Sequence, residues 1–202
     1  MTRPALRALF IAMLFAALAG CALAPAADPP LTSSLLDQVP TQVPHRTLSS
    51  NTLLVFAPEA RPAIDTAQMA YSLRAHHLAY YAQNQWAETP PQMLQPLLVR
   101  TLEATGAFRA VVASPHTGPY ALGLRTEMTE LVQDFAQEPP MLRLSLRVRL
   151  NDGSANRVLA TREITVKQPM QQKGPQAGVA AANAALAQAL EQVAGFVLEN
   201  SP

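Results

Sequence analysis

The side chains best suited to catalysis or metal binding are few and widely spaced in this sequence. The histidines stand at His45, His76, His77 and His116. If His76 and His77 lie on a strand, their side chains point to opposite faces and cannot share one metal ion. His45 falls in a Pro-rich segment and His116 in a Pro-Gly loop. We therefore expect no metal site.

The closest acidic pairs are Glu127 with Glu130 and Asp134 with Glu138. Glu127 and Glu130 would point to opposite faces of a strand, so the expected role is solvated surface charge. The chain also has no phosphate-binding loop, no glycine-rich dinucleotide fingerprint and no Gly-x-Ser-x-Gly nucleophile elbow. These absences predict a protein that is not an enzyme and has no cofactor. A periplasmic hydrolase would need a convergent polar pocket, which the sequence does not display.

The single cysteine, Cys21, is the residue with the clearest chemistry. It follows Leu18, Ala19 and Gly20, and this run resembles the bacterial lipobox, in which the cysteine thiol receives a diacylglycerol. Arg3 and Arg7 precede an apolar stretch over residues 8–20, which is the layout of a secretory signal. That stretch is too short to cross a bilayer, which needs about 20 residues. Ordinary secretory cleavage after residue 19 or 24 is the alternative, and Pro25 disfavours the second.

The overall composition excludes several functional classes. Charged residues make up 14% of the chain, and 15 Lys and Arg nearly cancel 14 Asp and Glu. This balance argues against nucleic acid as a partner, because phosphate binding needs clustered positive charge. Hydrophobic residues make up 49%, which argues against disorder for most of the chain. One cysteine supplies neither a disulfide framework nor a Cys-based zinc cluster.

The composition also divides the chain into three parts. Residues 1–20 form a lipoprotein signal peptide, and residues 21–48, which are rich in proline, form a lipidated tether. An ordered N-terminal arm over Leu31–Leu36 is the alternative for part of that tether. Residues 49–202 form the folded domain, and no solenoid-length repeat is visible.

The first half of the domain contains short apolar segments. Residues 52–56 predict a buried strand. Residues 69–73 and 77–81 predict a hairpin around residues 74–76, with a helix over 66–84 as the alternative. Residues 108–112 predict a further strand.

A helix with a clear start is predicted in the middle of the chain. Thr89 is a candidate N-cap, Pro90 takes the first helical position, and Gln92 completes a capping box. Leu94, Leu97, Leu98, Thr101 and Leu102 share one face. Gly106 is placed to end the helix, and Pro96 is expected to kink or delay it.

The second half of the domain predicts an antiparallel meander followed by a helix. Residues 142–150 alternate apolar with polar side chains, and residues 120–135 and 158–166 supply its neighbours. Arg143, Arg147 and Arg149 form a basic face. We interpret it as solvated and balanced by acids such as Glu127 or Glu163, with a partner surface as the alternative. An Ala-rich helix after residue 175 completes an α+β fold, in which an antiparallel sheet carries two main helices and follows a flexible lipidated tether.

Several segments resemble a known family. They are Met69–Tyr71, Leu78–Tyr81, Asn84–Pro91, Leu102–Phe108, Leu131–Phe135 and Ala182–Leu186. They resemble the ABC-type transport auxiliary lipoprotein component family, which includes the Pqi-type lipoproteins that accompany MCE-domain lipid transport systems. Pro96 departs from the usual composition of the helix.

The resemblance implies a periplasmic α/β domain without established catalytic residues. Its motif positions in this chain are Tyr71, Tyr80, Trp86, Pro90, Pro91, Asp134 and Asn183. We expect them to be structural, with the aromatic side chains and prolines forming a cluster at the helix entry.

The sequence thus predicts a lipid-anchored, non-enzymatic auxiliary lipoprotein of an ABC/MCE transporter. It would work beside an MCE-domain protein, a permease and an ATPase, and support the transport of phospholipid or another hydrophobic substrate. Ala22 after the cysteine favours the outer membrane over the inner one. The alternative is an assembly or docking subunit of another outer-membrane machine, for secretion or lipopolysaccharide export. Self-association into a homo-oligomer stays open.

Overall fold

The elements of the computed structural model follow the apolar patterns of the sequence. The structure describes residues 30–155 and 157–202, and residues 31–202 form one unit. The strands are β1 (Thr32–Ser34), β2 (Thr52–Val55), β3 (Glu59–Ala60), β4 (Gln68–Ser72), β5 (Ala79–Trp86), β6 (Ala110–Ala113), β7 (Leu122–Asp134), β8 (Met141–Asp152) and β9 (Arg157–Pro169). The helices are α2 (Pro90–Ala104) and α3 (Pro175–Asn200). The predicted α+β class is confirmed.

The sheet is mixed, whereas an antiparallel one was predicted. Strands β7, β8 and β9 form the predicted antiparallel meander, and β4 with β5 forms the predicted hairpin. The helix alternative over 66–84 is therefore wrong. However, β2 pairs in parallel with β6 and β7, β1 pairs in parallel with β5, and β3 and β4 pair in parallel with β7. Parallel partners need long connections, such as residues 56–109 between β2 and β6, which include α2 and return the chain in the same direction.

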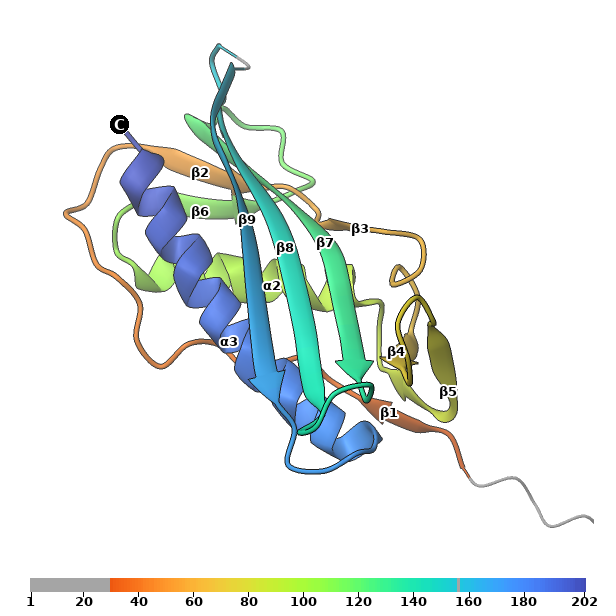
Figure 1. The fold of residues 1–202 in the computed structure, drawn as a ribbon. Helices are drawn as coiled ribbons and strands as arrows, with labels where there is room; N and C mark the ends of the chain where they lie inside the picture. The colour runs from red at the N-terminus through yellow and green to blue at the C-terminus, as the bar shows by residue number, and fades with distance from the viewer. Residues whose placement is uncertain (1–29, 156) are drawn as a thin grey trace, which may run out of the picture. The chain divides into compact units, whose positions relative to one another are not determined.

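Both helices pack on the same side of the sheet. In Figure 1, α2 and α3 lie behind β7, β8 and β9, whose other face is turned to the viewer. The alternating apolar side chains of β8 are all buried against the helices, as predicted. They are Leu142, Leu144, Leu146, Val148 and Leu150. The arginines between them lie on the uncovered face.

Helix α2 begins and ends where the capping residues predict. The Thr89 N–H donates to Gln92 Oε1 at 3.1 Å. Gly106 follows the helix with a φ of 65°, a conformation that favours glycine, and its N–H donates to the Glu103 carbonyl at 3.0 Å. Pro96 is exposed inside the helix, which begins at Pro90 and runs through it to Ala104, so the proline does not delay the helix.

Residues 31–48 correct the predicted boundary between tether and domain. They pack on the domain as an ordered arm, here called the N-terminal arm, which begins with β1. Leu36 is only 4% exposed within the main core. The Arg46 guanidinium donates to the carbonyls of Leu198 and Ser201 at the end of α3. The folded domain therefore starts at Leu31 rather than residue 49, while residues 1–29 lie outside the described residues.

Candidate functional site

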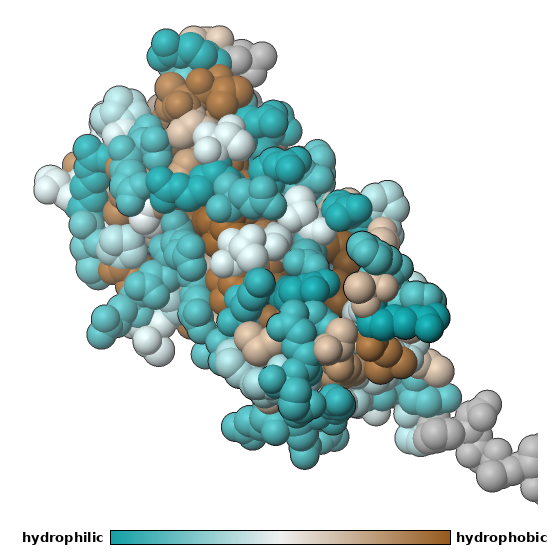
Figure 2. All heavy atoms as spheres, in the orientation of Figure 1, coloured by the Kyte–Doolittle hydropathy of each residue, from teal (hydrophilic) through white to brown (hydrophobic). Residues whose placement is uncertain are grey.

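A charged groove crosses the uncovered face of the sheet. It has a volume of about 570 Å³ and lies between β7, β8 and the segment that follows β3. Figure 2 shows this side of the molecule as largely hydrophilic. The lining residues are Arg61, Ala63, Ile64, Leu78, Glu127, Thr129, Glu130, Val132, Arg143, Ser145, Arg147 and Glu163.

A β-bulge in β7 brings two glutamates to this groove. The pairing of β7 with β8 shifts by one residue between Met128 and Glu130. Because side chains alternate along a strand, the extra residue exchanges the two faces. Glu127 and Glu130 therefore line the same groove, and the prediction that they point to opposite faces is wrong. A bulge leaves no clear mark in the apolar pattern.

Arg143 is held between two carboxylates. Its Nη2 lies 2.8 Å from Glu130 Oε1, and its Nη1 lies 2.8 Å from Asp134 Oδ2. The Asp134 side chain is only 4% exposed and also accepts from the Ala136 N–H at 3.0 Å. Asp134, a motif position, thus fixes the arginine and the turn after β7. These contacts support the predicted structural role.

The remaining charges on the uncovered face are arranged in rows across the strands. Arg147 pairs with Glu127 of β7 at 3.3 Å and stands opposite Glu163 of β9. The next row places Arg149 opposite Arg125, whose guanidinium lies 3.8 Å from the centre of the Phe56 ring. Balance of the basic face by neighbouring acids is confirmed for Arg143 and Arg147.

The aromatic motif positions do not form one cluster. The ring of Tyr71 lies 4.7 Å from that of Tyr81 and 6.0 Å from that of Phe135. Tyr80 points to the other side of β5 and donates its hydroxyl proton to the Ala63 carbonyl at 2.8 Å. Trp86, at the end of β5, is buried in the core. Pro90 and Pro91 occupy the buried first turn of α2.

Tyr81, which the motif positions did not include, connects the hairpin to β7. Its hydroxyl donates to Gln133 Oε1 at 2.9 Å, and burial raises its pKa to about 12. Gln133 in turn packs against Gly178 of α3, where any Cβ would overlap the glutamine side chain. Glycine inside a helix can mark such close approach, but α3 also contains Gly195, where a Cβ would meet nothing within 4 Å, so the sequence does not single out Gly178.

Asn183 attaches the N-terminal arm to α3. Its Oδ1 accepts from the Asp37 and Gln38 N–H groups at 2.9 and 3.1 Å. Its Nδ2 donates to the Leu35 carbonyl at 3.0 Å and to the Val179 carbonyl, one helical turn back, at 3.2 Å. These contacts support the predicted structural role of this motif position, because they hold residues 35–38 of the arm against α3.

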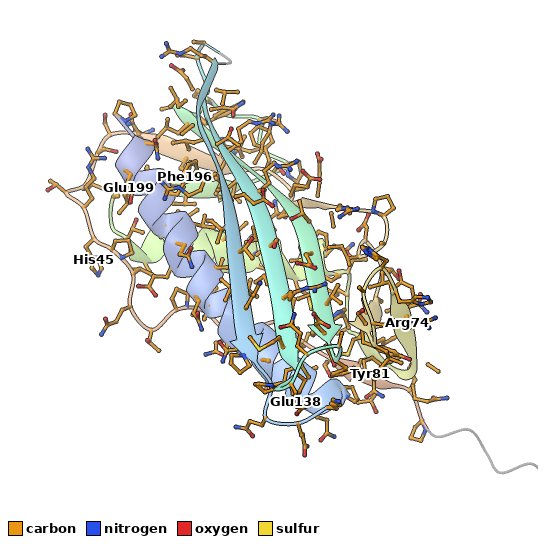
Figure 3. The ribbon with its side chains drawn as sticks, in the orientation of Figure 1. His45, Arg74, Tyr81, Glu138, Phe196 and Glu199 are labelled. Atoms are coloured by element: carbon orange, nitrogen blue, oxygen red, sulfur yellow. The ribbon has the colours of Figure 1, made fainter. Side chains whose placement is uncertain are left out.

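The histidines do not gather into a site. His76 and His77 lie in the loop between β4 and β5 rather than on a strand, and Arg74 Nη2 lies 2.8 Å from His77 Nε2. Figure 3 shows Arg74 on the hairpin and His45 on the opposite side of the molecule. Within residues 30–155 and 157–202, no three His, Cys, Asp or Glu side chains are grouped to hold a metal ion. Leu18, Ala19, Gly20 and Cys21 lie outside the described residues.

These features define a small α+β domain with one helix-covered and one charged sheet face. The chain belongs to the ABC-type transport auxiliary lipoprotein component family, whose model matches residues 34–194. The resemblance found in the sequence is thereby confirmed, and a lipoprotein family indicates a location in the cell envelope. No curated protein matches the chain. Among the described residues, no helix is long and apolar enough to cross a membrane.

Solved structures share this fold. Protein XCC0632 from Xanthomonas campestris, of family model DUF330, is 25% identical with a TM-score of 0.71, covering 85% of this chain and 96% of its own. An uncharacterized protein is 15% identical with a TM-score of 0.68, covering 84% of this chain and 99% of its own. Protein CT253 from Chlamydia trachomatis is 11% identical with a TM-score of 0.51, and the match covers 75% of this chain and 100% of CT253.

Proposed function

We propose that this protein is a non-enzymatic subunit, anchored through a lipid on Cys21, that docks an ABC/MCE transport system at the periplasmic face of the outer membrane. The family match over residues 34–194 carries the proposal. The partners are an MCE-domain protein, a permease and its ATPase. The cargo of the whole system is phospholipid or another hydrophobic molecule.

The lining of the groove favours docking over carriage of that cargo. Six charged side chains line it: Arg61, Glu127, Glu130, Arg143, Arg147 and Glu163. Covering them with acyl chains would remove water from charged groups without replacing its hydrogen bonds, at a high free-energy cost. A partner protein with complementary charges can replace those bonds. We infer that the charged groove contacts protein and that the cargo passes through the partners.

The ion pairs of the groove suit such a surface better than they suit catalysis. Glu127 and Glu130 each lie against an arginine, at 3.3 and 2.8 Å. No histidine is among the described residues that line the groove. The two lining hydroxyls are bonded away from the carboxylates: Thr129 donates to the Ser145 carbonyl at 3.2 Å, and the Ser145 hydroxyl lies 3.0 Å from that of Thr165. Arginine in a fixed position recognises carboxylates of a partner by paired hydrogen bonds.

The experiment is affinity purification of the tagged full chain from membranes. The expected result is co-purification of an MCE-domain protein or a permease. Arg147→Glu should reduce that yield, whereas Arg162→Glu should not. The two arginines are matched, because their side chains are 48% and 44% exposed and each forms an ion pair, but Arg162 pairs with Glu199 of α3 outside the groove. Recovery of a β-barrel or secretion component would instead support the alternative docking role.

A further inference from the structure

The loop between β4 and β5 presents apolar and basic side chains together. This loop, Leu73–Leu78, is here called the tip loop, and all six of its residues are exposed. Leu73 is 65% exposed and Leu78 is 40% exposed, and they flank Arg74, Ala75, His76 and His77. The loop contains no acidic residue. Exposed leucines beside cationic groups are typical of segments that lie at a membrane surface.

The conformation of the tip loop is held by its own hydrogen bonds. The Ser72 hydroxyl and the His77 N–H both donate to the Arg74 carbonyl, at 2.8 and 3.3 Å. The Arg74 side chain bonds the His77 ring at 2.8 Å. Because the loop is already ordered, a contact with a surface costs little conformational entropy.

The start of β1 faces the end of the hairpin that carries the tip loop. β1 runs parallel to β5, with Thr32 opposite Asn84, so the start of β1 faces the same direction as the start of β5, where the tip loop lies. Asn84 is five residues from Ala79, or about 17 Å along the strand. Ten residues separate Leu31 from Cys21, and they span at most ~36 Å. A cysteine anchored in a bilayer thus leaves the tip loop within reach of the same surface.

We propose that the tip loop contacts the bilayer in which the protein is anchored, with Leu73 among the acyl ends of the headgroup layer and Arg74 on anionic headgroups. Leu78, which also lines the charged groove, stays outside this contact. This inference rests on the lipid anchor of the proposed function. The contact can be weak, because the anchor holds the loop at a high effective concentration near the surface. It orients the domain, so that the charged groove is presented to partners at a constant height.

The test uses the lipidated protein in vesicles of phosphatidylethanolamine and phosphatidylglycerol in equal parts. Cys21 is the only natural cysteine, and the lipid occupies its thiol. Ala75→Cys therefore supplies a single site for an environment-sensitive fluorophore. The label should show a blue-shifted emission and be quenched by lipids that carry a quencher near the headgroup. The same label at Ser154→Cys, in the turn between β8 and β9, should show neither effect.

Three variants assign the contact. Leu73→Ser should abolish the blue shift, whereas Leu48→Ser, which changes an equally exposed leucine elsewhere, should leave it intact. Arg74→Gln should reduce the shift in the mixed vesicles to that seen in phosphatidylcholine alone. Circular dichroism melts check that each variant is folded.

The outcomes separate this inference from the proposed function. Co-flotation with vesicles together with an unshifted label at residue 75 would overturn the contact but leave the anchor intact. A blue shift without quenching by lipid would mean a protein contact and would also overturn it. If the lipidated protein without a fluorophore fails to float with vesicles, both the lipid anchor and the tip-loop contact are overturned, because the contact depends on the anchor.

Discussion

Replacing Asn183 by Ala should release the N-terminal arm while the rest of the domain stays folded. Three hydrogen bonds, of 2.9, 3.1 and 3.0 Å, join this side chain to the arm. A protein hydrogen bond contributes about 0.5–1.5 kcal/mol, and these are solvent-accessible, so the low end applies and the sum is about 1.5 kcal/mol. The arm should therefore open about tenfold more often.

Hydrogen exchange at the Asp37 and Gln38 amides measures this opening directly. The global free energy of unfolding should fall by only about 1 kcal/mol, because Ala is the better helix former and offsets part of the loss. Asn200→Ala is the matched control: its Nδ2 bonds the Phe196 carbonyl at 2.7 Å, and it lies about 25 Å further along α3. Unchanged exchange of both arm amides in Asn183→Ala would refute the assignment of Asn183 as the residue that holds the arm.

Three further changes test other parts of the structure. Burial raises the pKa of Tyr81 from 10.0 to about 12, so the contribution of its hydroxyl to stability should be complete below pH 10 and should decrease as the pH rises toward 12. Denaturant titrations should show this decrease in the wild type but not in Tyr81→Phe. Parallel pH profiles of the two proteins would contradict the prediction. Gly178→Ala should destabilise the fold by about 1–3 kcal/mol through overpacking against Gln133. Gly195→Ala should stabilise it slightly, because a Cβ at residue 195 meets nothing within 4 Å. Equal effects of the two substitutions would refute the close packing of Gly178 against Gln133. Arg143→Ala leaves the buried Asp134 carboxylate without its cation and should cost about 1–3 kcal/mol, measured by the same titrations; a neutral result would show that the pair contributes nothing.

Local sequence patterns predicted the elements of this fold well where periodicity and capping were strong. The alternation over residues 142–150 identified both β8 and its buried face, because one side of that strand contacts the helices. Thr89, Pro90 and Gly106 located the ends of α2, because caps satisfy backbone groups within a few residues of the chain. These signals depend only on near neighbours in sequence.

The arm and the groove depended on contacts that the sequence does not display. Residues 31–48 have the proline content of a tether, yet Leu36 is buried and Asn183, nearly 150 residues away, bonds their backbone. The bulge in β7 moved Glu130 to the face of Glu127, and strand alternation alone predicted the opposite. Both outcomes come from pairing between distant segments.

The sequence by itself determined the strand and helix segments, the family, and the lipobox-like run that ends in Cys21, since each is written in consecutive residues. The tertiary structure alone decided the parallel pairs of the sheet, the start of the domain at Leu31 and the gathering of six charges in one groove. The reason is physical: strand partners and surface neighbours are selected by the burial of the whole core, and no local pattern encodes which distant segment completes it.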